Sequence, residues 1–245
     1  MIETVIAAGC SLTKDFIQQT WPDYLAASLS ADLDNVGARG AGMKFVSRRA
    51  MMALEHHHCD YSLVVVMLPS SDRFDCYVDS NHVMRDDFVN ISSWQDGLEP
   101  GLINLDGTVS QRNGYCLSGG QHRSLKKSYY KHYHNATAAW IDYWFDVINL
   151  QNYLRVRRFR YVFCMAYDLH QTVEQPVNFG NIEYDAMLNL VDFSRFVFYQ
   201  HQRGFLSFAK DRGYAFDRHY PVSAAHQDFV ESLLLPKLYH AGISQ

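Results

Sequence analysis

Short apolar runs alternate along this chain with longer stretches in which apolar residues recur every three or four positions. Runs of apolar, often β-branched residues that end at glycine or proline predict buried parallel strands. Candidate strands lie at residues 4–8, 33–36, 64–66 and 161–165, and the first three of these runs lead to glycine or proline. The run at 33–36 is the weakest of the four, because two of its residues are polar.

Helix-like stretches lie between and after these runs, at residues 21–29, 45–54, 136–153, 193–210 and 224–235. Strands that alternate with helices are typical of a parallel sheet covered by helices on both faces. The pattern therefore predicts a three-layer α/β/α sandwich with a doubly wound, mainly parallel sheet. In such a sheet the functional site lies beyond the carboxyl ends of the strands.

Residues 76–131 interrupt the alternation after the third strand. This segment is rich in Asp, Ser, Asn and Gly, shows little periodicity, and is longer than the ~12–15 residues usual for a plain loop. We interpret it as an insertion that acts as a lid or contacts substrate. Because no linker or internal repeat is evident, residues 1–245 are predicted to form a single domain.

Composition narrows the range of partners. A formal net charge of −4 gives no overall reason to expect a nucleic acid or an anionic membrane as partner. The longest apolar run, at residues 63–68, is far too short to span a bilayer, and no secretory signal is evident at the N-terminus. Five scattered cysteines are typical of reduced thiols. We therefore expect a cytoplasmic protein without a membrane partner.

The first candidate for chemistry is Ser11, in the sequence Gly9-Cys-Ser11-Leu-Thr13 directly after the first predicted strand. At the carboxyl end of a strand, a side chain can face a cleft. A serine hydroxyl there becomes a nucleophile if a base removes its proton and donors receive the oxyanion. Taken alone, the motif is more typical of a turn or a helix cap.

A glycine-rich turn follows the second predicted strand, with glycines at positions 37, 40 and 42. Glycine allows a backbone to approach a ligand closely, so the N–H of Gly40 could face the same cleft. The spacing matches neither a P-loop nor GxGxxG. A plain left-handed turn before the next helix explains the glycines equally well.

Asp217-Arg-His219 precedes the last predicted helix and contributes an acid and a base. A carboxylate two residues before a histidine can fix the imidazole tautomer while the other ring nitrogen faces a serine. The alternative is an exposed loop with incidental charges. His226, in the first turn of the helix, is the competing base.

Together, the serine turn, the glycine turn and Asp-x-His resemble the SGNH/GDSL hydrolase family. Trp21-Pro22 and Asn35-Val-Gly37 extend the resemblance over roughly the first 50 residues. The resemblance implies a flavodoxin-like fold with Ser11 as nucleophile. It also implies that Asp217 and His219 activate Ser11, and that the N–H groups of Ser11 and Gly40 receive the oxyanion.

Two departures from the family pattern concern the same site. The family has Gly-x-Asn-Asp after its third strand, whereas this chain has Pro69-Ser-Ser71-Asp72, so Ser71 takes the place of the asparagine donor. Loss of one oxyanion donor typically costs ~2.7–4 kcal/mol in the barrier. Tyr220 also separates His219 from the following proline, which keeps His226 open as the base.

We therefore expect a serine esterase that cleaves a short acyl ester, such as an acetyl group on a carbohydrate, without a cofactor. An inactive member that binds a glycan or nucleotide, or an acyltransferase with the same triad, is the alternative. No metal is expected at residues 56–59, His-His-His-Cys, because consecutive side chains diverge. The basic and aromatic residues 126–134 could bind single-stranded nucleic acid, but the acidic chain argues against such a partner.

Overall fold

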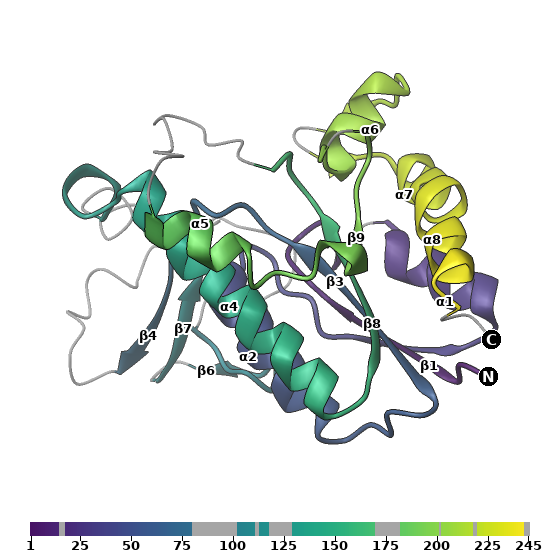
Figure 1. The fold of residues 1–245 in the computed structure, drawn as a ribbon, viewed down its shortest axis with the longest axis horizontal. Helices are drawn as coiled ribbons and strands as arrows, with labels where there is room; N and C mark the ends of the chain where they lie inside the picture. The colour runs from purple at the N-terminus through teal and green to yellow at the C-terminus, as the bar shows by residue number, and fades with distance from the viewer. Residues whose placement is uncertain are drawn as a thin grey trace.

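A sheet of five parallel strands forms the centre of the computed structural model (Figure 1). In spatial order its strands are β2 (Asp32–Asn35), β1 (Thr4–Ala8), β3 (Ser62–Leu68), β8 (Arg160–Met165) and β9 (Phe196–Val197). The structure describes residues 1–14, 18–79, 102–110, 113–117, 129–169, 182–200, 202–217 and 220–242. The four predicted strands are confirmed, and β9 adds a short strand at one edge.

Helices cover both faces of the sheet, which confirms the predicted three-layer fold (Figure 1). One layer contains α2 (Met43–Leu54), α4 (Ala136–Val156) and α5 (Ile182–Leu188). The other contains α1 (Trp21–Leu29), α6 (Phe205–Asp211), α7 (Ser223–Phe229), a π-helical turn (Val230–Leu234) and α8 (Leu235–His240). None of the helices in the described ranges has the length and apolar character that crossing a membrane requires.

Each face of the sheet has its own hydrophobic core. Successive side chains of a strand point to opposite faces, so Ile6 and Ala8 of β1 pack with α2 and α4, whereas Val5 and Ala7 pack with α1 and α7. All residues of β3 are buried. Burial on both faces explains why the central strands are continuous apolar runs rather than alternating ones.

The described part of the insertion contains a small antiparallel sheet that the sequence did not predict. Its strands, in the order β4-β7-β5-β6, are β4 (Asp75–Asp79), β7 (Asn113–Leu117), β5 (Leu102–Ile103) and β6 (Val109–Ser110). Tyr115 and Leu117 of β7 belong to the core formed with α2 and α4. Strands of two to five residues depend on pairing for their stability, which explains why local periodicity missed them.

The helix predicted at residues 193–210 is wrong in its first part and confirmed only from Phe205 onward. The described residues of this segment form a short 3-10 turn (Phe193–Arg195), then β9, and α6 begins only after Gly204. Phe196 and Val197 are buried and pair with Phe163 and Cys164 of β8. A run rich in Phe, Val and Tyr suits a buried strand as well as a helix, and the open edge of β8 decides between them.

Candidate active site

The direction of the chain connections reverses between two central strands. From β1 the chain passes to β2 on one side, and then crosses to β3 on the other side of β1. In doubly wound sheets, ligands bind in the crevice that such a reversal leaves at the carboxyl ends of the strands. Ser11 follows β1 and Ser71 follows β3, so these two predicted site residues flank the reversal.

Ser11 lies in a tight turn that neighbouring segments hold in place. Within the turn, the N–H of Thr13 donates to the carbonyl oxygen of Cys10 at 2.9 Å. The carbonyl oxygen of Thr13 accepts from the Thr20 hydroxyl at 2.8 Å and from the Asn35 side-chain amide at 2.9 Å. Ser11 is only 5% exposed. The start of α1 and the end of β2 thus fix the turn that carries the predicted nucleophile.

Gly9 is required for this turn. Its φ of +154° is one that side-chain-bearing residues rarely adopt. A Cβ atom at this position would lie 2.1 Å from the Oγ1 of Thr13 and 2.8 Å from the carbonyl oxygen of Met67. The glycine therefore allows the Ser11 turn to pack closely against β3.

The loop that contains Gly40 contacts the Ser11 turn directly. The N–H of Ala38 donates to the carbonyl oxygen of Gly9 at 3.0 Å, and the N–H of Gly37 donates to the Asn35 side-chain oxygen at 3.1 Å. Gly40 has a φ of +78°, in the left-handed region that favours glycine. The second predicted oxyanion donor thus lies in a loop that is hydrogen-bonded to the loop of the first.

Ser71 is 6% exposed, and its hydroxyl oxygen is buried. Within the described residues, this hydroxyl has no hydrogen-bond partner. Buried polar groups are nearly always paired, and leaving one unpaired costs free energy. The hydroxyl lies just beyond the carboxyl end of β3, where the resemblance places the third oxyanion donor.

The C-terminal acid lies in a short hairpin of two strands, β10 (Phe216–Asp217) and β11 (Tyr220–Pro221). Asp217 is exposed, and His219 lies outside the described residues. The side-chain amide of Gln18 donates to the carbonyl oxygen of Pro221 at 3.0 Å. The hairpin therefore contacts the segment that links the Ser11 turn to α1, although about two hundred positions separate them in the sequence.

His226, the competing base, is buried in the interior of one helical layer. It is 1% exposed, and its Nδ1 accepts a hydrogen bond from the N–H of Trp21 at 3.2 Å. Its ring packs on Phe205 with 4.6 Å between ring centroids. The first turn of a helix leaves N–H groups without partners inside the helix, and His226 satisfies one of them at α1.

The sequence analysis missed a buried carboxylate beside the Gly40 loop. Asp75, at the start of β4, accepts hydrogen bonds from the N–H groups of Gly42 at 2.9 Å and Phe45 at 3.0 Å. Burial raises the pKa of Asp75 to about 6, against the opposite effect of these two hydrogen bonds. No local pattern marks this residue, because only the fold brings β4 to the start of α2.

A second missed feature is a contact between residues 129–134 and the loop after β3. The Nε2 of His134 lies 3.6 Å from a carboxylate oxygen of Asp72, and the Tyr130 hydroxyl donates to the Asp72 carbonyl oxygen. The ring of Tyr129 stacks on Phe74 at 3.9 Å. These rings thus contact the loop after β3, which contains Ser71. The lysines before residue 129 lie outside the described residues.

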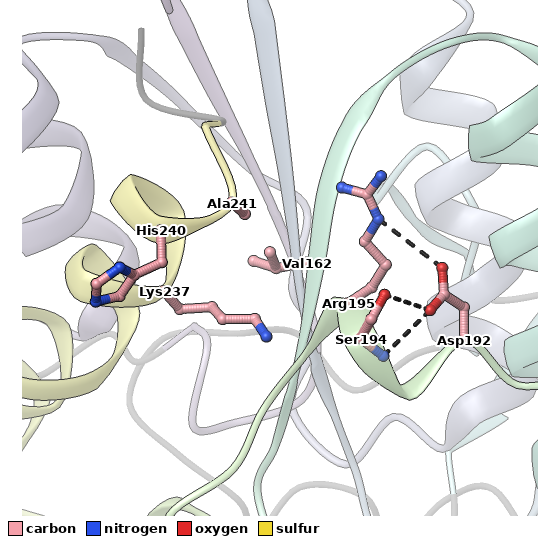
Figure 2. A pocket seen from close by; sticks show the side chains of 7 residues that line it. All are labelled: Val162, Asp192, Ser194, Arg195, Lys237, His240 and Ala241. Atoms are coloured by element: carbon pink, nitrogen blue, oxygen red, sulfur yellow. Dashed lines mark hydrogen bonds and ion pairs between the residues drawn. The ribbon is translucent and has the colours of Figure 1, made fainter.

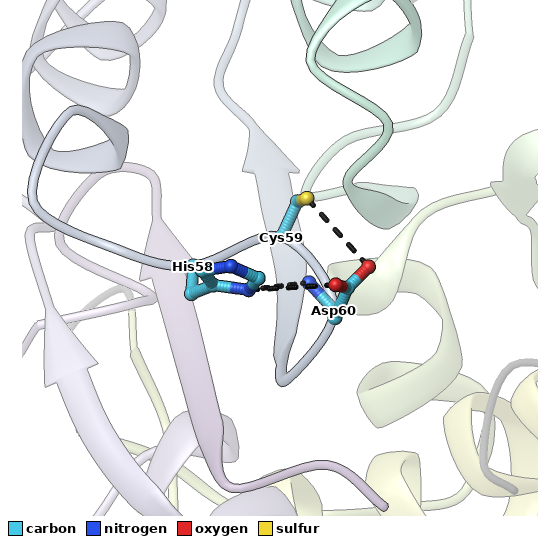
Figure 3. A group of neighbouring side chains, drawn as sticks. All are labelled: His58, Cys59 and Asp60. Carbon is cyan, nitrogen blue, oxygen red and sulfur yellow. Dashed lines mark hydrogen bonds and ion pairs between the residues drawn. The ribbon is translucent and has the colours of Figure 1, made fainter.

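His58, Cys59 and Asp60 form a cluster in the turn before β3 (Figure 3). One potential ligand atom from each residue lies within 4.8 Å of the others. The argument that consecutive side chains diverge is therefore wrong for these three residues. The cluster lies at the amino end of β3, the edge opposite Ser71, and two of its three members are exposed, so it is separate from the candidate site.

A cavity of about 360 Å³ lies between β8, the turn before β9 and α8 (Figure 2). Lys237 extends from α8 toward Ser194, which precedes β9 (Figure 2). The lining residues are Val162, Asp192, Ser194, Arg195, Lys237, His240 and Ala241. None of the predicted site residues is among them, and the turn leads into the amino end of β9, away from Ser11.

No family model matches the sequence, and no curated protein matches it. Among solved structures, one similar chain is described as a lipolytic protein of the G-D-S-L family from Desulfitobacterium hafniense DCB-2. The TM-score is 0.44 and the identity 9%, over 93% of this chain and 95% of that one. Another is described as a GDSL-like lipase from Parabacteroides merdae ATCC 43184, with a TM-score of 0.46 and 12% identity, over 98% and 96% of the two chains.

A third similar structure is an acetyl xylan esterase from the rumen bacterium Butyrivibrio proteoclasticus, with a TM-score of 0.44 and 12% identity. The similarity covers 99% of this chain but 65% of that one, so the chain spans less than two thirds of that enzyme's length. Likenesses of this degree do not identify an activity.

Proposed function

We propose that this protein is a serine hydrolase that cleaves a short acyl ester through a covalent acyl-enzyme. The observation that carries the proposal is the position of Ser11 and Ser71, which flank the connection reversal at the carboxyl edge of the sheet. The hydrogen bond between Ala38 and Gly9 adds the Gly40 loop to the same edge. This geometry supports a nucleophile with two further oxyanion donors beside it.

In the proposed first half-reaction, the Ser11 hydroxyl attacks the ester carbonyl carbon while the His219 imidazole takes its proton. Asp217 stabilises the imidazolium that forms. The N–H groups of Ser11 and Gly40 and the Ser71 hydroxyl donate to the tetrahedral oxyanion. The intermediate expels the alcohol, which takes the proton from His219, and the acyl group stays on Ser11. Water then repeats the sequence and releases the acid.

For the substrate we propose an acetyl or similarly short acyl ester on a carbohydrate. The loop after β3 is covered by tyrosine and histidine side chains from residues 129–134. Tyrosine combines an apolar ring with a polar hydroxyl, a combination that suits both the faces and the hydroxyl groups of a sugar. We propose that residues 129–134 contact the alcohol portion of the ester.

Replacement of Ser11 by alanine tests the proposal. Because the nucleophile is removed, kcat for p-nitrophenyl acetate should fall by at least about 10³-fold. A fluorophosphonate probe should label the wild-type protein at Ser11 and leave Ser11→Ala unlabelled. Unchanged hydrolysis by Ser11→Ala would rule out the mechanism. A wild-type protein that binds a glycan but neither hydrolyses ester nor takes up the probe would be a binding protein.

Two histidine variants serve as a matched pair in the same experiment. His219→Ala should lower kcat about as much as Ser11→Ala and leave the melting temperature nearly unchanged. His226→Ala should instead destabilise the fold by roughly 2–4 kcal/mol, because it empties a packed site and leaves the Trp21 N–H without its acceptor. The reverse pattern would assign the base to His226.

A further inference from the structure

Arg73 lies where the loops after three strands of the central sheet meet. It belongs to the loop after β3, next to Ser71 and Asp72. Its Nη1 donates to the carbonyl oxygen of Ala41, in the loop after β2, at 2.9 Å. Its Nη2 donates to the hydroxyl of Tyr167, which follows β8, at 3.4 Å. One guanidinium thus connects the loops that follow β2, β3 and β8.

Arg73 and Asp75 hold the two ends of a single peptide group. The carbonyl oxygen of Ala41 and the N–H of Gly42 belong to the same planar unit. Arg73 donates to that oxygen, and Asp75 accepts from that N–H at 2.9 Å. The loop after β3 also packs tightly here, since a Cβ atom on Gly42 would lie 2.9 Å from the Arg73 carbonyl oxygen. The orientation of this peptide is therefore fixed from both sides.

The neighbouring N–H of Ala41 donates to the carbonyl oxygen of Ala38 at 3.2 Å. The backbone on the C-terminal side of Gly40 is thus held by hydrogen bonds on two successive peptides. The N–H of Gly40 belongs to the peptide that directly precedes these two, so it adjoins a segment that hydrogen bonds hold. Rotation of the Ala41–Gly42 peptide would be transmitted to the Gly40 turn.

The guanidinium also contributes a fixed positive charge. Burial by itself would lower the pKa of Arg73, but interactions with Cys10, Tyr167 and Asp75 raise it overall, so the side chain remains charged. Cys10 directly precedes Ser11. A fixed charge in a partly buried site acts on developing negative charge more strongly than it would in water.

We infer that Arg73 is a positioning residue of the proposed ester-cleaving site, where it fixes the Ala41–Gly42 peptide and thereby the Gly40 oxyanion donor. The inference rests on the proposed function for its catalytic consequence. The hydrogen bonds of Arg73 and Asp75 to the Ala41–Gly42 peptide, here called the clamp, are independent of that function. Arg73 belongs to the loop in which Ser71 replaces the asparagine of the family pattern. From there it supports the N–H of Gly40, the oxyanion donor in the loop after β2.

Arg73→Met and Arg73→Lys test this role. Methionine removes the charge and both donors, so kcat for p-nitrophenyl acetate should fall roughly 10- to 100-fold while KM changes less than about threefold. Lysine keeps a cationic donor for the Ala41 oxygen and should recover part of the loss. Rates are expressed per Ser11 titrated with the fluorophosphonate. A merely structural role would lower the titratable fraction and leave kcat per site unchanged.

Amide hydrogen exchange gives a readout that does not require activity. Residues 36–44 should exchange faster in Arg73→Met than in the wild-type protein. Arg157→Met is the matched control, since Arg157 pairs with Glu55 outside the site, and it should change neither kcat nor this exchange. Unchanged exchange in Arg73→Met would overturn the inference. Faster exchange in a protein without Ser11-dependent hydrolysis would refute the proposed function and leave the clamp standing.

Discussion

The hydroxyl of Ser71 is a case in which stability and function make opposite demands on one residue. Folding gains nothing from a buried donor without a partner, and an alanine of nearly the same size would avoid the cost. Here the group lies at the carboxyl end of β3, next to the reversal of the chain connections between β1 and β3. The proposed function at this edge of the sheet gives a physical reason for a donor that the folded protein leaves unpaired.

Ser71→Ala should therefore separate activity from stability. Without the hydroxyl, kcat should fall roughly 10- to 100-fold, whereas the free energy of unfolding should stay the same or rise, by up to about 1–3 kcal/mol, because no hydrogen bond within the described residues is lost and a buried unpaired group is removed. Steady-state kinetics and urea unfolding measure the two effects. Ser47→Ala is the control, since it removes the hydrogen bond from Ser47 to the Lys44 carbonyl oxygen on α2 and should leave kcat unchanged. A fully active Ser71→Ala would remove Ser71 from the site.

At the scale of elements, the start of α2 depends on a residue from another strand. The helix begins at Met43 after Gly42, which has no side chain to cap it. Asp75 of β4 accepts from two N–H groups of this first turn instead. The small antiparallel sheet therefore takes part in fixing the helix that follows the Gly40 loop.

The titration of Asp75 should appear as a pH-dependent stability. Its pKa is raised from 3.8 to about 6, mainly by burial, so the folded protein binds a proton more tightly than the unfolded chain. The contribution of this group to the free energy of unfolding must then fall as pH rises from about 4 to about 6, by on the order of 3 kcal/mol. The wild-type protein should lose stability relative to Asp75→Asn over this range.

Urea unfolding of both proteins between pH 4 and 7.5 measures the difference. The pKa of Asp146 is also raised to about 6, mainly by burial, and the charge of Asp75 adds to the shift. The burial effect is common to both proteins, whereas Asp75→Asn removes the smaller contribution from Asp75. A difference between the two free energies of unfolding that does not change with pH, or that shifts in favour of the wild-type protein as pH rises, would contradict the assignment. A constant offset added to the expected pH-dependent difference would reflect the amide itself and leave the prediction intact.

At the scale of the whole molecule, the two hydrophobic cores share the same strands. Adjacent residues of β1 and β3 supply opposite cores, so neither core can form without the sheet that both require. Tyr115 and Leu117 connect the small antiparallel sheet to one of these cores. The arrangement predicts that the layers unfold together.

Calorimetry should accordingly show one unfolding transition, with a van't Hoff enthalpy close to the calorimetric enthalpy. The single domain predicted for residues 1–245 has the same consequence. Two resolved transitions, or an enthalpy ratio far from about one, would indicate that a part of the chain folds independently. Limited proteolysis would then locate the boundary of that part.

Prediction from sequence succeeded where the controlling interactions are local. Runs such as Thr4–Ala8 and Trp21–Leu29 contain enough apolar residues in one period to indicate both the type and the ends of the element. It failed for β9 and the strands of the insertion, because strands of two to five residues depend on pairing with a neighbour. Phe196 and Val197 became a strand because β8 had an open edge.

By itself the sequence determined the parallel α/β architecture and the placement of Ser11 and Gly40 at the ends of strands, since these follow from residues close together along the chain. Only the tertiary structure decided that Arg73 and Asp75 hold the Ala41–Gly42 peptide, and that His226 accepts from Trp21. These contacts join positions that are far apart in the sequence. They come together only after the strand order has brought the loops to one edge of the sheet.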